Sequence, residues 1–524
     1  MSDEARYYSG TVILLKQNSN TLNASHGISG ATPTLARIIP RDGHPVSRSQ
    51  ISPEALRVLY RLREAGFQAF LVGGCVRDLM LGLAPKDFDV ATDALPEQVK
   101  RLFRNCRLIG RRFRLAHVYF GREIIEVATF RAATAPSQGE DPELLEALAE
   151  ATDEVGIDAQ DDLADESFDT PAQGGVSDPE CGSGGDEERL IDESGRILRD
   201  NVYGNIDDDV WRRDFTCNAL YYNIADFSIW DYCNGFEDVM ARRLRLIGDP
   251  ETRYREDPVR MLRAARFEAK LGFTLEPATA EPIASLQGLL DGVPAARLFD
   301  ESLKLFLTGH GVRSFEVLQA RGLLHSLMPN VADFLRQYPG SAPEQLLRQG
   351  LKNTDDRVHA GKPVTPGFLF AVLLYGPIGR TIERAPPSQW RDIGTILDAV
   401  DLEVRRVQGR IAIHRRFVLG IRDMYALQSR LEQPRGRRAL RTLEHPKFRA
   451  AFDLFELRGQ FGMADSRWVE WWRSLQSVSP AEREAMCAAT ASPSERSGSR
   501  RRGGRRRPRR GPGVMARGGA DGAD

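Results

Sequence analysis

The sequence predicts an α/β N-terminal domain followed by an all-helical C-terminal half. Short apolar segments at 69–72, 88–91 and 123–130 have the length of buried strands, and amphipathic segments lie between them. After residue 250, long stretches with helical periodicity continue to about residue 475. The chain has 524 residues, of which 41% are hydrophobic and 28% charged, which is typical of a soluble protein with several domains.

Local signals define the elements in order. Ser52 followed by Pro53 predicts the start of a helix, because a serine hydroxyl caps free N–H groups and proline fits the first turn. Residues 96–104 have a basic amphipathic pattern, and further strands are expected at 218–224 and 228–232. Core helices are expected at four amphipathic stretches, 257–271, 295–308, 312–323 and 410–430.

Three segments lack the pattern of a folded core. Residues 1–45 show no sustained periodicity, 138–190 contain eighteen acidic residues and one arginine, and 481–524 include nine arginines between Arg496 and Arg510. Low hydrophobicity combined with high charge predicts disorder. We therefore expect a disordered N-terminal extension, an acidic disordered insertion and a disordered arginine-rich tail around three folded regions, 46–235, 236–300 and 301–480.

Charge and composition restrict the class of partner. Outside the acidic insertion the chain holds 71 Lys and Arg against 55 Asp and Glu, which favours a polyanion such as nucleic acid. The longest apolar run, 368–375, has eight residues, far fewer than the ~20 that a membrane helix needs. With no apolar signal segment and six scattered cysteines without a CxxC pair, we expect a cytoplasmic protein with reduced thiols and no membrane contact.

The first motif with chemical meaning is LVGGCVRD at 71–78. Gly73 and Gly74 stand where a strand meets a helix, so backbone N–H groups there can approach an anion closely. Arg77, one turn into the helix, can add a charge-assisted contact to a phosphate. A tight turn with a surface pair of Arg77 and Asp78 is the structural alternative.

Two carboxylates form the second motif, KDFDV at 86–90. Asp87 and Asp89 alternate with Phe88 and Val90, so both carboxylates project from one face of a strand. Paired carboxylates repel each other unless a cation neutralises them, and Mg²⁺ takes oxygen ligands and bridges phosphates. Close to the Gly-Gly turn, this pair predicts a magnesium site rather than a solvated edge strand.

The third cluster, DVWRRDFT at 209–216, precedes a new strand. Arg213 can reach a triphosphate, and Asp214 can complete a triad of carboxylates. Glu126, on its own strand, competes for that third position, and the pattern does not choose between the two. A structural ion pair is the alternative for each of them.

The fourth motif, REDPVRMLRAARF at 255–267, begins a helix. Arg260 and Arg263 are three residues apart and share a face that Arg266 continues. Together with Asp257 they offer the donors and acceptors that a reader of a nucleobase edge needs. A cationic solvated face is the alternative.

A basic segment with interleaved aromatic residues lies between the second and third motifs. Six basic residues occur from Arg101 to Arg114, a pattern that suits a strand or loop lying along RNA. We expect His117, just after this segment, to be a packed polar residue rather than a metal ligand.

In this order the motifs resemble one family. LVGGCVRD, PKDFDVATDA, RRDFTCNALYY and EDPVRMLRAARF are similar to the bacterial class II nucleotidyltransferases, which include CCA-adding tRNA nucleotidyltransferases and poly(A) polymerases. The resemblance covers roughly residues 40–470, and segment 102–121 and the arginine-rich tail favour the poly(A) polymerase branch. It implies an α/β nucleotidyltransferase palm domain followed by a helical neck, body and leg.

The resemblance also implies residue roles. Asp87 and Asp89 are expected to hold two Mg²⁺ ions, with Asp214 as the third catalytic carboxylate. Positions expected to contact the incoming nucleotide are Gly73, Gly74, Arg77, Arg213, Asp257, Arg260 and Arg263. The acidic insertion departs from the shorter linker that is usual in the family, but it spares every motif.

We therefore expect a polynucleotide adenylyltransferase that adds AMP from ATP to RNA 3′ ends without a template and releases pyrophosphate. The resemblance implies that such tails promote RNA decay, and we expect a monomer that meets the RNA-decay machinery. One alternative is a CCA-adding enzyme, which needs CTP and a tRNA acceptor. The other is a non-catalytic RNA-binding protein on the same scaffold, against which Asp87, Asp89 and Asp214 argue.

Overall fold

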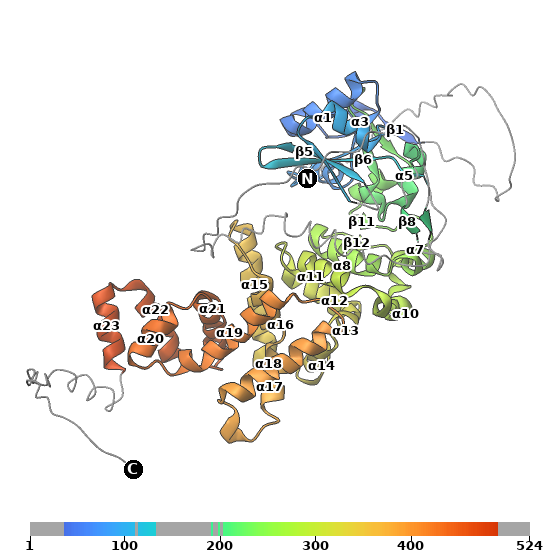
Figure 1. Ribbon diagram of the computed structural model, residues 1–524. Coiled ribbons are helices and arrows are strands. Elements are labelled where there is room, and N and C mark those ends of the chain that lie inside the picture. Colours follow the sequence, from blue (N-terminus) through green and yellow to red (C-terminus); the bar gives the residue numbers. More distant parts are fainter. Residues whose placement is uncertain (1–35, 111–113, 133–189, 192–196, 200–202, 491–524) are drawn as a thin grey trace, which may run out of the picture. The chain divides into compact units, whose positions relative to one another are not determined.

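The computed structural model describes residues 36–110, 114–132, 190–191, 197–199 and 203–490 (Figure 1). The chain divides into two compact units, residues 1–381 with 401–418, and residues 382–400 with 419–524. The predictions of disorder for 1–35, for nearly all of 138–190 and for 491–524 lie outside the described residues. For 481–490 the prediction of disorder is wrong, because Pro480–Ala489 forms the helix α23, which Ser479 caps and in which Cys487 is buried.

A mixed β-sheet forms the N-terminal part of the first unit. Its strand order is β1-β10-β9-β2-β3-β6-β5-β4, in which β3 and β6 are parallel and the other neighbours are antiparallel. The strands are β1 (Arg37–Ile39), β2 (Ala69–Val72), β3 (Asp89–Thr92), β4 (Cys106–Ile109), β5 (Leu115–Phe120), β6 (Glu123–Thr129), β9 (Leu220–Asn223) and β10 (Ile229–Asp231). Two short two-stranded sheets join β7 (Leu190–Ile191) to β8 (Ile197–Arg199) and β11 (Arg243–Leu244) to β12 (Thr274–Leu275).

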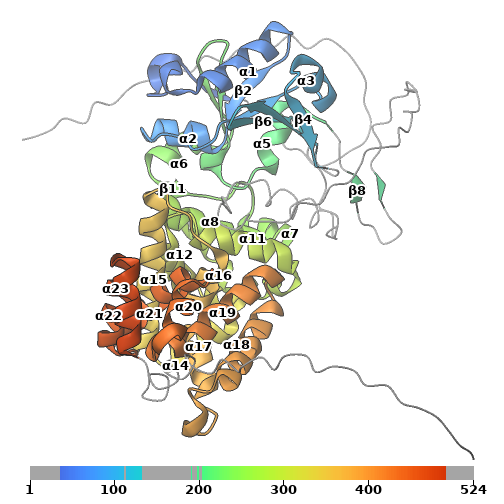
Figure 2. The ribbon, with the colours of Figure 1, turned by 60° about the vertical axis from the view of Figure 1, so that its left-hand side comes forward.

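Helices cover both faces of this sheet. All residues of β2 are buried, as expected for an apolar strand inside a sheet with both faces covered. Figure 2 shows α1 (Pro53–Glu64) and α3 (Pro96–Leu102) on one side and α5 (Ile206–Arg212) on the other. On the α5 side, Phe70 and Val72 pack with Val210 and Tyr221 in one apolar cluster. The predicted cap of α1 is confirmed, because the Ser52 hydroxyl accepts a hydrogen bond from the Ala55 N–H at 3.1 Å.

One edge of the sheet corrects a prediction. The sequence predicts residues 36–45 to belong to a disordered extension, and this is wrong, because β1 pairs with β10 and Arg41–Gly43 forms a 3₁₀ turn. A strand of three residues is too short to show periodicity. Its hydrogen-bonding partner, with Arg37 opposite Asp231, lies far away in the sequence.

The rest of the first unit is helical, as the periodicity after residue 250 predicts. The four predicted core helices are present as α8 (Val259–Leu271), α11 (Ala295–Phe306), α12 (Gly311–Ala320) and α19 (Arg415–Glu432). The other helices are α2 (Gly74–Met80), α6 (Gly235–Met240), α7 (Pro250–Glu256), α9 (Pro277–Ala280), α10 (Ile283–Leu286), α13 (Leu323–Leu327), α14 (Pro329–Gln337), α15 (Ala342–His359), α16 (Pro366–Leu373) and α17 (Tyr375–Ile382). Stacked rings of Phe299, Phe370 and Phe417 lie in this part of the core.

The second unit has its own apolar core. α18 (Ile393–Gln408) and α19 carry the chain between the units, and α20 (Gly436–Leu443), α21 (Phe448–Gln460), α22 (Ser466–Ser477) and α23 (Pro480–Ala489) follow. Trp472 is fully buried against Phe448 and donates its indole N–H to the Leu431 carbonyl at 2.9 Å. In the described part of the chain, no helix combines the length and the apolar character needed to span a membrane.

Gly235 allows α6 to pack against the 3₁₀ turn Thr216–Asn218. A Cβ at Gly235 would lie 2.2 Å from the Thr216 carbonyl oxygen, which is backbone and has no rotamer with which to yield. We expect Gly235→Ala to lower the free energy of unfolding by about 2 kcal/mol, as overpacking does in other cores. Thermal unfolding checks this against Gly288→Ala, where a Cβ meets nothing within 4 Å. Equal midpoints for the two variants would contradict the close packing.

Candidate active site

Acidic side chains gather where β3 and β6 run side by side. In the parallel register of these strands, Asp89 lies opposite Glu126. Asp87 lies two residues before Asp89, the first residue of β3, and the predicted alternation holds, since Asp87 and Asp89 are exposed whereas Phe88 and Val90 are buried. The carboxylates of the DFD motif therefore project from the sheet, and Glu126 joins them from the neighbouring strand.

The electrostatics of this acidic edge reflect the crowding of like charges. Although Asp89 keeps part of its surface in water, desolvation and the neighbouring carboxylates of Glu126 and Asp87 raise the pKa of Asp89 to about 6. The Nε2 atom of His117 lies 3.5 Å from Glu126, in register on β5. His117 is half-buried at this contact, and its role as a packed polar residue rather than a metal ligand stays a prediction.

β2 is the neighbour of β3 in the sheet, and a turn with two glycines follows it. Gly73 has φ +79° and ψ −133°, a conformation that side-chain-bearing residues rarely adopt. A Cβ at Gly73 would lie 3.7 Å from Arg213 Nη1, and a Cβ at Gly74 would lie 3.3 Å from Arg77 Nη2. Two guanidinium groups from different elements therefore approach the turn that the sequence predicts to be a phosphate site.

Arg213 is held by a buried acceptor pair. Its Nη2 lies 3.0 Å from Asp209 Oδ2, and its Nε donates to the Tyr221 hydroxyl at 2.8 Å. Burial opposes the charge, but Tyr221 and Asp209 outweigh this and raise the pKa of Arg213. The guanidinium is therefore a fixed positive charge beside the Gly73 turn.

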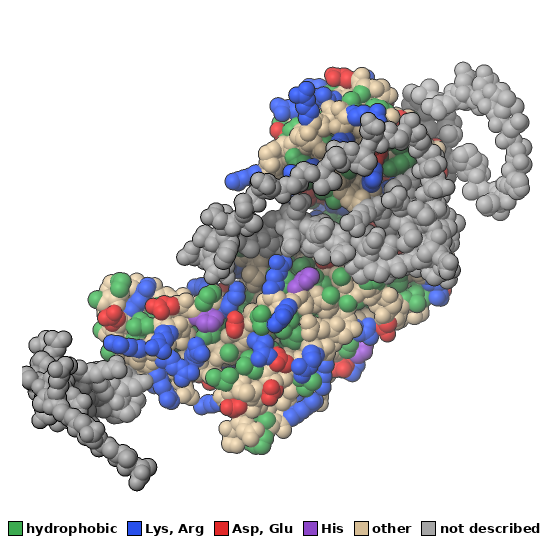
Figure 3. All heavy atoms as spheres, viewed as in Figure 1, with side chains coloured by type: hydrophobic (Ala, Val, Ile, Leu, Met, Phe, Trp, Pro, Cys, Tyr) green, Lys and Arg blue, Asp and Glu red, His purple; other side chains and the backbone are tan. Residues whose placement is uncertain are grey.

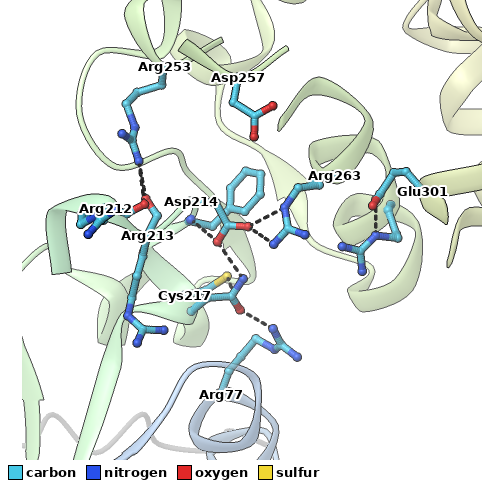
Figure 4. Close-up of polar contacts among 12 residues, drawn as sticks. Arg77, Arg212, Arg213, Asp214, Cys217, Arg253, Asp257, Arg263 and Glu301 are labelled. Carbon is cyan, nitrogen blue, oxygen red and sulfur yellow. Dashed lines mark hydrogen bonds and ion pairs between the residues drawn. The ribbon is translucent and has the colours of Figure 1, made fainter. Parts of the chain in front are cut away.

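A continuous polar chain links this turn to helix α8 (Figure 4). Arg77, which is buried, donates to Asn218 Oδ1, and Asn218 Nδ2 donates to Asp214 Oδ1 at 3.3 Å. Asp214 Oδ2 in turn accepts from Arg263 Nη2 at 2.5 Å and from Arg263 Nε at 3.0 Å. The chain connects α2, the 3₁₀ turn after RRDF and α8, which are far apart in the sequence.

Asp214 is consequently an engaged carboxylate. Burial acts to raise its pKa, but the Arg263 ion pair and the donors Phe215 N–H and Asn218 outweigh burial and lower it. Both oxygens already accept hydrogen bonds. The backbone of its neighbour Arg213 is also held, because Arg253 of α7 donates to the Arg213 carbonyl at 2.6 Å. This hydrogen bond connects α7 to the loop that carries Asp214.

The arginines of α8 face different partners. Arg260 donates to the Arg253 carbonyl at 2.7 Å and to Glu256 at 3.0 Å, whereas Arg266 pairs with Glu301 on α11 at 2.5 Å. Asp257, in the loop before α8, pairs with Arg297 of α11 at 2.9 Å. The shared face predicted for the arginines exists, but each guanidinium is already positioned by an oxygen acceptor.

Sequence reasoning missed several residues that position this site. Asn218 joins Arg77 to Asp214, Tyr221 and Asp209 orient Arg213, and Arg297 orients Asp257. For Asn218 and Asp209 a signal existed, since both lie within or next to the third cluster. No sequence pattern marks Arg297 as part of the site, because it is the packing of α11 that brings it to Asp257.

The acidic edge fits a divalent cation in its donor chemistry. Among the described residues, no group of three His, Cys, Asp or Glu side chains is already arranged around a common metal position. Carboxylate oxygens are nevertheless the donors that Mg²⁺ takes, and a cation here would stabilise the ionised form of Asp89, whose pKa desolvation and the neighbouring carboxylates raise. Asp87 and Asp89, with Glu126 beside them, are therefore suitable ligands.

Comparison with known proteins identifies the family. The Poly A polymerase head domain matches residues 69–245, the probable RNA and SrmB-binding site of polymerase A matches 272–335, and the arginine-rich C-terminus of polymerase A matches 390–510. Poly(A) polymerase I of Salmonella typhi is 44% identical over 455 residues, which cover 86% of this chain and 88% of the relative. The chain belongs to the bacterial poly(A) polymerase I family.

Two further relatives define the branch. Poly(A) polymerase I of Haemophilus influenzae is 40% identical over 444 residues, covering 84% of this chain and 88% of its own length. The CCA-adding enzyme of Lactobacillus helveticus is 31% identical over 281 residues, covering only 54% and 55%. The poly(A) polymerase branch is therefore favoured over the CCA-adding alternative.

Family membership confirms the main predictions. The chain is an enzyme, a nucleotidyltransferase of the polynucleotide adenylyltransferase class, and not a non-catalytic relative. The predicted fold class is confirmed by a sheet-containing N-terminal domain and a mostly helical C-terminal half. The head-domain match contains the glycine turn, the carboxylate pair and the RRDFT segment, whereas the RNA-binding match starts after α8.

Proposed function

We propose that the described site transfers AMP from ATP to the 3′-hydroxyl of RNA without a template and releases pyrophosphate. The observation that carries this proposal is the position of the acidic edge, on β3 and β6, next to the Gly73-Gly74 turn on β2 with its two arginines. Nucleotidyl transfer needs carboxylates for metal ions at the reacting phosphate and cations for the leaving phosphates. This arrangement offers both.

Each group has a role in this proposal. Arg77 and Arg213 hold the triphosphate beside the glycine turn, where backbone N–H groups add further donors. Asp87 and Asp89 would hold two Mg²⁺ ions, and bound metal would supply a lower pKa for the RNA 3′-hydroxyl and positive charge beside the leaving pyrophosphate. The sheet orients these carboxylates, so the RNA end and the α-phosphate meet at its acidic edge.

The geometry favours Glu126 for the third carboxylate position. Glu126 lies in register with Asp89 and raises the pKa of that residue. Asp214 has both oxygens occupied, chiefly by Arg263, so it positions that arginine. The resemblance to the family assigns the catalytic role to Asp214, and that assignment stays a prediction until the two variants are compared.

We place the selection of the nucleobase at the N-terminus of α8. Asp257 and Arg260 would read the edge of the adenine and replace a template, and Arg263 would act beside them. Arg297 and Glu256 hold the two readers in fixed orientations, which lowers the entropy lost on binding. The RNA itself would be held by backbone charge with little sequence preference.

The wider setting is part of the same proposal. We infer that the RNA partners are mRNA and other RNA 3′ ends, and that the tails mark these RNAs for decay in the cytoplasm by a monomeric enzyme. The RNA-binding match in the helical half and the basic charge of the chain outside the acidic insertion support an RNA substrate.

Asn218 provides a test of the polar chain. Asn218→Ala removes one acceptor of Arg77, which keeps its ion pair with Asp78, and one donor to Asp214, so we expect the KM for ATP to rise about tenfold with a smaller change in kcat. Steady-state kinetics with varied ATP measure this. Asn223→Ala is the control, because the Asn223 side-chain oxygen only supports a local turn to Ala225. An unchanged KM for Asn218→Ala would show that this hydrogen-bonded chain of side chains does not contribute to ATP binding.

The substrate assignment is tested by two acceptors. The full chain is incubated with Mg²⁺ and either ATP or CTP, once with an unstructured RNA and once with a tRNA lacking its terminal CCA. We expect long AMP tails on the unstructured RNA and little use of CTP on either acceptor. Addition of two CMP residues to the tRNA, with no tailing of the other RNA, would instead establish the CCA-adding function.

A further inference from the structure

A hollow in the second unit has the features of an anion site. It has a volume of about 330 Å³ and lies where the start of α18 meets the end of α19 and the start of α20. All of its lining residues fall within 382–400 and 419–524, so the hollow belongs to one compact unit. Figure 3 shows Lys and Arg side chains gathered on the surface over α19 and α20.

Positive charge dominates the lining of this hollow. Its two acidic residues are engaged elsewhere, since Asp392 accepts from the Thr395 N–H at 3.1 Å and Glu432 pairs with Arg458. Four arginines line it, namely Arg391, Arg430, Arg435 and Arg438. Within the described residues no acidic side chain pairs with these four, so the hollow has an excess of cationic donors.

Two buried polar atoms in the lining lack partners. The Ser429 hydroxyl and Arg430 Nε are both shielded from solvent, and neither makes a hydrogen bond within the described chain. Leaving a buried charged donor unsatisfied is costly, and such groups are normally paired. A group rich in acceptor oxygens that bound in the hollow would lie beside both of these lining residues.

The surroundings favour RNA over a small anion. Trp390, which adjoins Arg391 in the sequence, is 41% exposed, and Ile393 in the lining is 37% exposed. An exposed indole beside arginines is typical of single-strand binding, where bases stack on aromatic rings and cations hold the backbone. On α20 the exposed Arg437 and Arg441 extend the cationic surface away from the hollow.

We propose that this hollow binds a backbone phosphate of single-stranded RNA upstream of the 3′ end, with a base stacked on Trp390. The site rests on the proposed function, because RNA is the substrate there. It lies outside the nucleotide site, so it contributes to the hold on RNA and not to the choice of ATP.

A charge-matched pair of variants tests the site. Arg391→Gln with Arg438→Gln removes two exposed guanidiniums of the lining, and Arg449→Gln with Arg467→Gln removes two exposed arginines elsewhere in the same unit. Anisotropy with a labelled 20-mer RNA at several salt concentrations gives Kd for each. We expect the first variant to bind about tenfold more weakly and to lose about 0.7 units of salt slope, the value for one phosphate contact on a single strand. Its kcat at saturating RNA and its KM for ATP stay unchanged.

A second measurement places the RNA directly. RNA containing 4-thiouridine is crosslinked to the full chain, and we expect mapped crosslinks in 385–393 or 429–441. Equal weakening in both double variants, or crosslinks confined to other segments, would overturn the proposal. Displacement of the RNA by millimolar inorganic phosphate alone would also overturn it, in favour of a small-anion site. Failure of the wild-type chain to add AMP is a separate outcome that refutes the proposed function, whereas failure of the hollow leaves AMP addition intact.

Discussion

Replacing Asp89 by asparagine is expected to lower the rate of AMP addition about a thousandfold, because a metal ion supplies several kcal/mol of charge stabilisation in such transfers. Asp87→Asn should have a comparable effect, since both carboxylates project from the start of β3. Both side chains are exposed, so the fold tolerates the change and RNA binding should persist. Single-turnover incorporation of labelled AMP into RNA measures the loss.

The matched control for these variants is Glu64→Gln. Glu64 is an exposed carboxylate at the end of α1 in the same domain, so its loss changes the charge equally without touching the acidic edge. We expect wild-type rates for it. If Asp87→Asn and Asp89→Asn both retained more than a few per cent of activity, the assignment of the metal ligands would be wrong.

The comparison of Glu126→Gln with Asp214→Asn has the second largest expected effect. Glu126→Gln should lower kcat about a hundredfold and leave the KM for ATP nearly unchanged, because it removes a carboxylate that would help to hold the metal ions at the reacting phosphate. Asp214→Asn leaves the guanidinium of Arg263 without its anionic partner, so we expect a lower thermal midpoint and a higher KM instead. Steady-state kinetics and thermal unfolding of both variants separate these outcomes.

His117→Gln controls for the contact of Glu126 with its neighbour. This variant keeps the carboxylate and removes the imidazole that lies 3.5 Å from it. A small effect of His117→Gln beside a large effect of Glu126→Gln locates the function in the carboxylate. The reverse result, with a hundredfold loss of kcat in Asp214→Asn and little change in Glu126→Gln, would restore Asp214 as the third catalytic carboxylate.

Local patterns predicted the parts of the site that a single element determines. The alternation in DFD placed Asp87 and Asp89 outward and Phe88 inward, because successive residues of a strand point to opposite faces. The glycine pair predicted a strand-to-helix turn, and Gly73 indeed has a positive φ that few other residues tolerate. These features depend on covalent geometry, which the local sequence specifies.

Local sequence patterns could not predict which distant strands and side chains pair with one another. The register that sets Glu126 opposite Asp89 depends on parallel pairing of β3 with β6, and periodicity says nothing about which strands pair. The sequence predicts that Arg263 contacts the nucleotide, whereas the packing of α8 places its guanidinium on Asp214. The strand β1 escaped prediction for the same reason, because it forms by pairing with β10, which lies far away in the sequence.

The most direct test of the account is the stoichiometry of the reaction at the acidic edge. The full chain is incubated with a 20-mer RNA, Mg²⁺ and ATP, and AMP incorporated and pyrophosphate released are measured together, for the wild type and for Asp89→Asn. We predict one pyrophosphate for each AMP added at the 3′ end, loss of both signals on chelation of Mg²⁺, and near absence of both in Asp89→Asn. AMP addition by Asp89→Asn at the wild-type rate, or ATP hydrolysis without growth of the RNA, would contradict the account.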